Sequence, residues 1–202
     1  MKKKETTRDA VLSLVREAGI LRVRDLIERG IHPEYLRRLC REQLLTRVGR
    51  GLYVLPESKP SAHQTLAEVF KRIPHGVACL LTALRFHDIG TQNPREVWVA
   101  IDRRAARPRI THPPLRIARF SGESLTEGIE QHKIGGVMIK IYNPAKTVAD
   151  CFKYRNKIGL DVAEEALRDC LRQRKCVVDD LWRYAKICRV TNVIKPYLEA
   201  MT

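Results

Sequence analysis

The sequence predicts an α+β protein with two domains: a small N-terminal domain of three helices and a β-hairpin, then a larger mixed domain that ends in several helices. Apolar residues recur with helical spacing three times before residue 45, and two short strand-like runs follow around a glycine-rich turn. Beyond a polar, proline-bounded break, helices and strands are segregated rather than alternating regularly. We therefore predict domains at residues 1–56 and 61–202, joined by a linker at residues 57–60.

The charge balance favours a polyanionic partner. The 202 residues include 38 Lys and Arg against 23 Asp and Glu, a formal net charge of +15. The first 56 residues carry 13 basic and 7 acidic side chains, or +6, which leaves +9 for residues 57–202. Such a surplus is typical of proteins that bind nucleic acid, and less often of those that bind an anionic membrane or an acidic protein. A basic protein that is merely soluble is the plain alternative.

Targeting and metal-binding signals are missing from the sequence. No apolar run approaches the ~18 residues that a membrane span needs. The N-terminal MKKKETTRDA lacks the apolar segment of a secretory signal. The six cysteines form no CxxC pair, and Cys40 and Cys170 lie on apolar helical faces as free thiols would. We expect a cytoplasmic protein with no membrane contact, no metal and no cofactor.

The first two helices are short. Thr6 or Thr7 is expected to cap the first helix, and Gly19 to end it. An extended link at residues 20–22 leads to a second helix, which Gly30 ends. The inward side chains of the second helix are expected to be Val23, Leu26 and Ile27.

The third helix has two contrasting faces. Pro33 is well placed at its first turn. At 100° per residue, one arc is expected to dock on a core and the opposite arc to face outwards. The apolar arc holds Leu36, Leu39, Cys40, Gln43 and Leu44. The charged arc holds Glu34, Arg37, Arg38 and Arg41.

A basic β-hairpin is expected after the third helix. Its strands read TRV and LYVL on either side of Gly49-Arg50-Gly51, with Val48, Leu52 and Val54 sharing one face. Three short helices followed by a basic hairpin are typical of a winged helix-turn-helix. The sequence therefore predicts double-stranded DNA as the partner of the first domain.

The helix and hairpin supply the candidate DNA contacts. Recognition helices read base edges from their N-terminal residues, and an Arg can pair bidentately with guanine. The candidates for base reading are His32, Glu34, Tyr35, Arg37 and Arg38. Phosphate or groove contacts are expected from the other basic side chains of the helix, the hairpin, the N-terminal arm and a later loop: Arg41, Arg47, Arg50, Lys2, Lys3, Lys4, Arg103, Arg104 and Arg107. The alternative is an ordinary solvated helix face.

The second domain is expected to contain six helices and two pairs of strands. The helices are predicted near residues 61–73, 78–87, 144–155, 161–172, 178–188 and 192–201. The strands are predicted at residues 96–101 and 115–120, on either side of the basic loop, and as a hairpin at residues 128–142 that turns at Gly135-Gly136.

Catalytic signals in the second domain are weak. The chain contains no GxGxxG, P-loop, HExxH or GxSxG motif. The nearest approach to a metal-dependent nuclease is a set of groups at strand ends and on the following helix: Glu96, Asp102, Lys140 and Asp150. A non-catalytic regulator is the favoured interpretation, and a DNA-targeted nuclease is kept as the alternative. Lys146 and Asp150, four residues apart, are expected to pair on an exposed helix face as structural support.

Four segments taken together resemble the AbiEi antitoxins: RVGRGLYVL, LTALRFHDIG, VWVAI and NPAKTVADCFKYR, in that order along nearly the whole chain. The resemblance implies a transcriptional repressor that is the antitoxin of a phage-defence toxin–antitoxin operon and binds inverted repeats in its own promoter. It also implies a nucleotidyltransferase-like toxin, neutralised directly or only functionally, and leaves self-association on DNA open. The sequence departs from the family pattern at Gln43, where a small residue such as Gly is expected before the wing.

Overall fold

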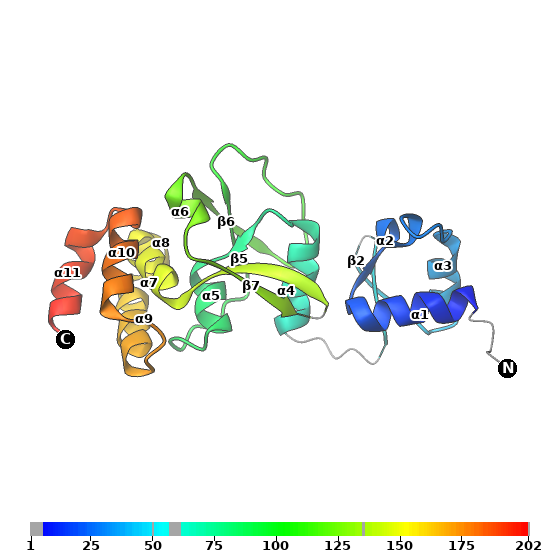
Figure 1. Ribbon diagram of the computed structural model, residues 1–202, viewed down its shortest axis with the longest axis horizontal. Helices are drawn as coiled ribbons and strands as arrows, with labels where there is room; N and C mark the ends of the chain where they lie inside the picture. The colour runs from blue at the N-terminus through cyan, green and yellow to red at the C-terminus, as the bar shows by residue number, and fades with distance from the viewer. Residues whose placement is uncertain (1–5, 50, 57–61, 135, 202) are drawn as a thin grey trace. The chain divides into compact units, whose positions relative to one another are not determined.

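The structure is a computed structural model that describes residues 6–49, 51–56, 62–134 and 136–201 (Figure 1). It is α+β, as predicted, and its contacts divide the chain into two compact units. Unit 1 comprises Met1–Arg72 with Lys133–Ile139, and unit 2 comprises Ile73–His132 with Lys140–Thr202. The predicted linker at residues 57–60 lies outside the described residues.

Unit 1 begins with three helices and a small sheet. Its elements, in chain order, are α1 (Thr7–Ala18), β1 (Leu21–Arg22), α2 (Val23–Ile27), α3 (Glu34–Arg41), β2 (Thr46–Gly49), β3 (Leu52–Val54) and α4 (Ala62–Arg72). Thr6 caps α1: the Asp9 amide donates to Thr6 Oγ1 at 3.2 Å, and the Thr6 amide donates to Asp9 Oδ2 at 3.3 Å. Gly19 ends the helix with a φ of 65°, as predicted.

The predicted hairpin forms the larger part of a three-stranded antiparallel sheet in the order β1-β3-β2. The residues predicted as an extended link thus include a short strand, and β3 is the central strand. The pairing shifts register between Arg47 and Gly49, so the strict alternation predicted for the hairpin is broken at Val48. Leu52, Tyr53 and Val54 are all buried.

The helices and the sheet enclose one apolar core. Its buried members are Val11, Val15, Leu21, Leu26, Leu36, Leu39, Leu45 and Tyr53. The prediction that Ile27 points inward is wrong, since its side chain is 58% exposed. The reason is the length of α2: in a helix of five residues, Val23 and Leu26 make the core contacts and Ile27 ends the helix beyond them.

Unit 2 contains most of a five-stranded mixed sheet in the order β6-β5-β4-β8-β7 and a group of helices (Figure 1). The strands are β4 (Val77–Ala78), β5 (Val97–Asp102), β6 (Leu115–Phe120), β7 (Ile129–Ile134) and β8 (Val137–Tyr142). The helices are α5 (Leu80–Phe86), α6 (Glu123–Thr126), α7 (Pro144–Lys153), α8 (Arg155–Ile158), α9 (Leu160–Arg172), α10 (Val178–Cys188) and α11 (Thr191–Glu199).

Helix α7 lies at the centre of this unit. It packs against α5, α9, α10 and α11, and every residue from Ala145 to Phe152 is buried. Asn143 caps it, and Pro144 stands at its first position. The surrounding core includes apolar side chains from the sheet and from all these helices.

Three features of unit 2 differ from the sequence prediction. The segment predicted as a helix from residue 78 begins at Leu80, because Val77 and Ala78 form β4 between β5 and β8. The short helices α6 and α8 were not predicted. Cys170 is not a free thiol, since it forms a disulfide with Cys176 at a Cα–Cα distance of 5.9 Å.

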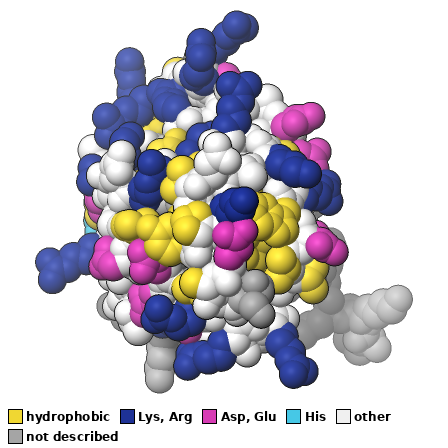
Figure 2. Space-filling model, turned by 90° about the vertical axis from the view of Figure 1, so that its left-hand side faces the viewer, with side chains coloured by type: hydrophobic (Ala, Val, Ile, Leu, Met, Phe, Trp, Pro, Cys, Tyr) yellow, Lys and Arg dark blue, Asp and Glu magenta, His cyan; other side chains and the backbone are white. Residues whose placement is uncertain are grey.

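The C-terminal helices form one end of unit 2. Ile194 and Leu198 of α11 are buried, and Val193 and Tyr197 are half-buried against the same core. On the face that Figure 2 turns to the viewer, apolar side chains gather in separate areas with acidic and basic side chains between and around them. Within the described residues, no helix has the length and apolarity to cross a membrane.

Candidate nucleic-acid interface

The end of α3 fixes which side chains this helix presents. Leu36 and Leu39 are buried against the core, as predicted. The helix stops at Arg41 in a Schellman motif: the Leu44 amide donates to the Leu39 carbonyl at 2.9 Å, and the Gln43 amide donates to the Cys40 carbonyl at 3.1 Å. Gln43 has a φ of 57° and is exposed. Its prediction on the apolar arc is therefore wrong, because the helix has ended before it.

The same motif accounts for the departure from the family pattern. The residue after a helix end commonly adopts the left-handed conformation, where Gly meets no steric penalty. Gln43 occupies that conformation in this chain. The turn is therefore made despite the missing glycine, and β2 begins three residues later at Thr46.

The outer face of α3 presents three arginines to solvent. The side chains of Arg37, Arg38 and Arg41 are 78%, 67% and 75% exposed. Glu34 accepts from Arg37 at 3.4 Å and from Arg41 at 3.1 Å, and Glu42 accepts from Arg38 at 2.9 Å. Exposed ion pairs of this kind contribute only about 0–1 kcal/mol to stability. The guanidinium groups are therefore oriented, yet they can exchange their partners for a ligand at little cost.

A basic residue from another helix joins this face. Arg8 of α1 lies 3.5 Å from Glu42, and it lines a hollow of about 520 Å³ together with Tyr35 and Arg38. Sequence reasoning missed Arg8. No spacing in the sequence links the first turn of α1 to α3, since only the packing of the two helices brings them together.

Two of the predicted base-reading residues also have roles in the fold. His32 is exposed, and its Nδ1 accepts from the Glu34 amide at 3.2 Å, so it helps to begin α3. Tyr35 is half-buried and packs against the core cluster. The remaining candidates on α3 carry no packing role of this kind.

The hairpin contributes Arg47 to the exposed surface. This side chain lies on β2, and its Nε donates to the Gly49 carbonyl at 3.1 Å. Arg50, predicted at the tip of the hairpin, and Lys2, Lys3 and Lys4 of the predicted N-terminal arm lie outside the described residues.

The three arginines predicted from the later loop belong to unit 2. The loop joins β5 to β6, and its start is fixed by the Arg103 amide, which donates to the Phe120 carbonyl at 2.9 Å. The Arg104 amide donates to Asp102 Oδ1 at 2.7 Å. Arg103 and Arg104 line a hollow of about 420 Å³ with Ser121, whereas Arg107 lines a separate groove.

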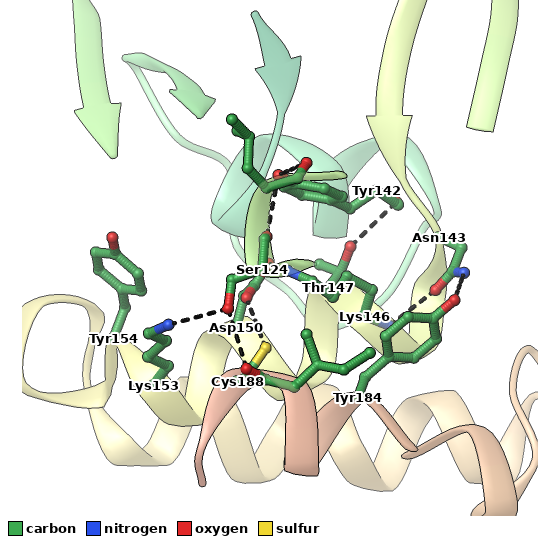
Figure 3. Close-up of polar contacts among 12 residues, drawn as sticks. Ser124, Tyr142, Asn143, Lys146, Thr147, Asp150, Lys153, Tyr154, Tyr184 and Cys188 are labelled. Atoms are coloured by element: carbon green, nitrogen blue, oxygen red, sulfur yellow. Dashed lines mark hydrogen bonds and ion pairs between the residues drawn. The ribbon is translucent and has the colours of Figure 1, made fainter. Parts of the chain in front are cut away.

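The acidic groups considered for a nuclease have separate environments. Asp150 is fully buried: Lys146 Nζ donates to its Oδ2 at 2.6 Å, and Cys188 Sγ donates to its Oδ1 at 3.2 Å (Figure 3). Burial is the largest influence on this carboxyl group and raises its pKa above the ordinary value. The prediction of an exposed pair is wrong, because α5, α9, α10 and α11 pack around α7.

The polar groups around this pair are satisfied within the fold. The ammonium of Lys146 lies 4.1 Å from the centre of the Tyr142 ring. Thr147 Oγ1 donates to the Tyr142 carbonyl at 3.1 Å, and Asn143 Nδ2 donates to the Tyr184 hydroxyl at 2.9 Å (Figure 3). A buried network in which each member has a partner joins α7 to the sheet and to α10.

The other two acids are placed elsewhere. Glu96 lies 3.5 Å from Arg116, and Asp102 accepts from the backbone of its own loop. In the described part of the chain, no group of three or more His, Cys, Asp or Glu side chains is arranged to hold a metal ion.

Comparison with known proteins identifies the N-terminal segment. Residues 9–56 match the sequence model of a family described as transcriptional regulators, AbiEi antitoxins, which confirms the predicted resemblance over this segment. A comparison with curated proteins gave no match. Among solved structures, the chain is similar to the crystal structure of the RV2827C protein from Mycobacterium tuberculosis, with a TM-score of 0.61 and 13% sequence identity. That similarity covers 92% of this chain and 73% of the other, and at this identity it concerns the fold alone.

Proposed function

We propose that this chain, an AbiEi-family antitoxin regulator by the match of its residues 9–56, is a sequence-specific transcriptional repressor that binds double-stranded DNA through a winged helix-turn-helix. In this proposal α2 and α3 are the helix-turn-helix and the β2–β3 hairpin is the wing. The protein represses its own operon by binding inverted repeats in the promoter.

One observation carries the proposal: α3 buries Leu36 and Leu39 and turns Arg37, Arg38 and Arg41 outwards. In the part of the chain that the structure describes, the only ion pairs of these three guanidinium groups are exposed and add little to stability. Holding three like charges on one helix face costs side-chain entropy and repulsion, and the stability of the fold does not explain why they are there. They suit a helix that presents donors to guanine edges and phosphates.

The two glutamates of this face support sequence discrimination. Glu34 and Glu42 hold the arginines in the free protein. On random DNA, each carboxylate would face phosphates and weaken binding. At the correct site an arginine can leave its glutamate for a guanine, and Glu34 can accept from a cytosine amino group. The carboxylates therefore oppose binding to most sequences, and the cost of placing them near phosphates is offset only where base contacts form.

In the proposed operon, the companion toxin is a nucleotidyltransferase-like protein, and unit 2 contributes to its neutralisation. Two half-sites in an inverted repeat match a protein that self-associates on DNA, since operator symmetry mirrors protein symmetry.

Gel-shift titration of the full chain on its own promoter region tests the proposal. Arg37→Ala and Arg38→Ala are expected to weaken binding to the operator by about 10- to 100-fold, at ~1–3 kcal/mol for each lost base contact, and to relax base preference. Affinity for the operator is expected to fall ~10³-fold between 50 and 200 mM salt if six phosphates are contacted. Arg172→Ala, which removes an exposed arginine of α9 that pairs with Asp169, is the matched control.

Two results would contradict the proposal. Unchanged affinity and base preference in both α3 variants would remove α3 as the reading element. Cleavage of plasmid by the purified protein with Mg²⁺ or Mn²⁺ would favour the nuclease instead.

A further inference from the structure

Unit 2 contains a basic groove that the proposed function does not use as a whole. It has a volume of about 520 Å³, and its walls include four cationic and two aromatic side chains. These are Arg107, Arg116, Arg119, Lys157, Trp98 and Tyr154.

The four cations reach the groove from three elements. Arg107 comes from the loop between β5 and β6, Arg116 and Arg119 come from β6, and Lys157 comes from α8. Because β6 is an edge strand of the sheet, side chains from both of its faces can line the same groove. The convergence is therefore a product of the tertiary fold and not of one charged run in the sequence.

Backbone contacts hold two of these side chains in place. The Arg119 guanidinium donates to the carbonyl oxygen of Asp102 at 3.0 Å and to that of Ala105. The Tyr154 hydroxyl donates to the Arg119 carbonyl at 3.0 Å. The groove therefore has a preorganised wall where the loop, β6 and the region after α7 meet.

Acidic side chains do not balance the charge of the groove. Glu96 lies 3.5 Å from Arg116. Among the residues that the structure describes, no carboxylate lies within ion-pair distance of Arg107, Arg119 or Lys157. Cations gathered around one hollow repel one another, and a ligand with closely spaced negative charges would relieve that repulsion.

The aromatic rings in the groove support cations and leave little surface for a base. The Arg116 guanidinium lies 5.5 Å from the Trp98 ring centre, and the Lys157 ammonium lies 5.4 Å from the Tyr154 ring centre. Trp98 itself is 6% exposed. A ligand would therefore be recognised through its charge, with little preference among bases.

We propose that this groove binds a small ligand with at least two adjacent phosphate groups, of the size of a nucleoside di- or triphosphate. The volume lies within the ~300–1,000 Å³ typical of small-molecule sites. Four cationic side chains from three elements suit a compact polyphosphate, which a concave site can surround. The site lies within unit 2 and does not depend on DNA binding by α3.

Tryptophan fluorescence offers a direct test, because the chain has only two tryptophans, Trp98 and Trp182. In a full-length Trp182→Phe variant, Trp98 alone reports on the groove. Titration with ATP, GTP and inorganic triphosphate is expected to give saturable signals with similar affinities, and AMP is expected to bind at least tenfold more weakly. Isothermal titration calorimetry on the unmodified chain measures the same dissociation constants without relying on tryptophan fluorescence.

Variants that remove positive charge from the groove or from α3 test whether the triphosphate binds in this groove. Arg107→Ala combined with Lys157→Ala is expected to weaken triphosphate binding at least tenfold. Arg37→Ala combined with Arg41→Ala, which removes two exposed cations from α3, is expected to leave it unchanged. The proposal is overturned if calorimetry detects no binding of ATP or triphosphate, or if both double variants weaken binding equally. It is also overturned if the groove variant lowers affinity only for duplex DNA.

Discussion

Two ion pairs with the same sequence spacing have opposite environments in this protein. Arg38 and Glu42 lie 2.9 Å apart at the end of α3, with side chains 67% and 32% exposed. Lys146 and Asp150 lie 2.6 Å apart on α7, with both side chains fully buried. The spacing of four residues allows either pair to form, but the surroundings decide its energetic role. The exposed pair can be exchanged for a ligand, whereas the buried pair can only be kept or lost as a unit.

The largest expected effect comes from breaking the buried pair. Asp150→Ala leaves the Lys146 ammonium in the core without a carboxylate and is expected to lower the free energy of unfolding by about 3–5 kcal/mol. Urea denaturation followed by tryptophan fluorescence measures this directly, because both tryptophans lie in unit 2.

A double replacement separates the cost of an unpaired charge from the value of the pair. Lys146→Met with Asp150→Leu removes both charges and fills their space with apolar side chains of similar volume. This double variant is expected to recover most of the free energy of unfolding that Asp150→Ala loses. If the double variant were as unstable as Asp150→Ala, then the polar network around Tyr142 and Cys188, and not the uncompensated charge, would be the main source of stability.

A second prediction concerns the pH dependence of stability that arises from a half-buried histidine. His87, at the end of α5, is half-buried, and its Nε2 lies 2.8 Å from the Tyr142 carbonyl oxygen. Burial is the main cause that lowers the pKa of its imidazole below 6.5. The hydrogen bond to the Tyr142 carbonyl and, less strongly, the charge of Glu130 oppose this shift, whereas His132 and Lys175 add to it. The unfolded chain therefore binds the proton more readily, and this contribution to stability is present above pH 6.5 and lost as the pH falls through that value.

The free energy of unfolding is accordingly expected to fall between pH 7.5 and 5.5 more in the wild type than in His87→Gln. One proton limits the difference to about 1.4 kcal/mol for each pH unit. Equal pH dependence in the two proteins, followed by tryptophan fluorescence in urea, would show that His87 has the same proton affinity in both states.

These examples indicate how far the sequence could predict the structure. Helical and alternating apolar patterns located α1, β6 and α9 to within a residue or two, because each pattern is local and repeats over several positions. Lys146 and Asp150 were correctly paired but wrongly expected at the surface. A helix buried on all sides carries no marker that separates its charged residues from solvated ones.

Short elements and distant contacts were harder to predict. β4 has two residues, too few for an alternating pattern, and it exists because β5 and β8 flank it. Arg8 lies beside Glu42, and Arg107 lines one groove with Lys157, through packing between segments far apart in the sequence. The composition of the candidate site on α3 was predictable, but its ion pairs were not predicted.

A third prediction concerns the residue that ends α3, where the expected change in the free energy of unfolding is about 1 kcal/mol. Gln43 holds a left-handed conformation, which costs a non-glycine residue roughly 1 kcal/mol. Gln43→Gly is expected to raise the midpoint of thermal unfolding of unit 1, measured by far-ultraviolet circular dichroism, and Gln43→Val to lower it. Gln173, exposed at the end of α9 with a φ of −84°, is the matched control, where glycine is expected to destabilise. A loss of stability in Gln43→Gly would mean that its side chain makes contacts worth more than the strain.

The smallest expected change in stability is at the exposed pair. Arg38→Ala, Glu42→Ala and the double variant form a cycle whose coupling energy is expected to be about 0.2–1 kcal/mol. If α3 reads DNA, the same variants separate in binding: Arg38→Ala weakens operator binding, whereas Glu42→Ala strengthens binding to random DNA because a carboxylate facing phosphates is removed. A large coupling energy with no change in either affinity would assign Arg38 to the fold. A small coupling energy with opposite effects on binding would instead mean that this pair, unlike the one on α7, is kept for recognition.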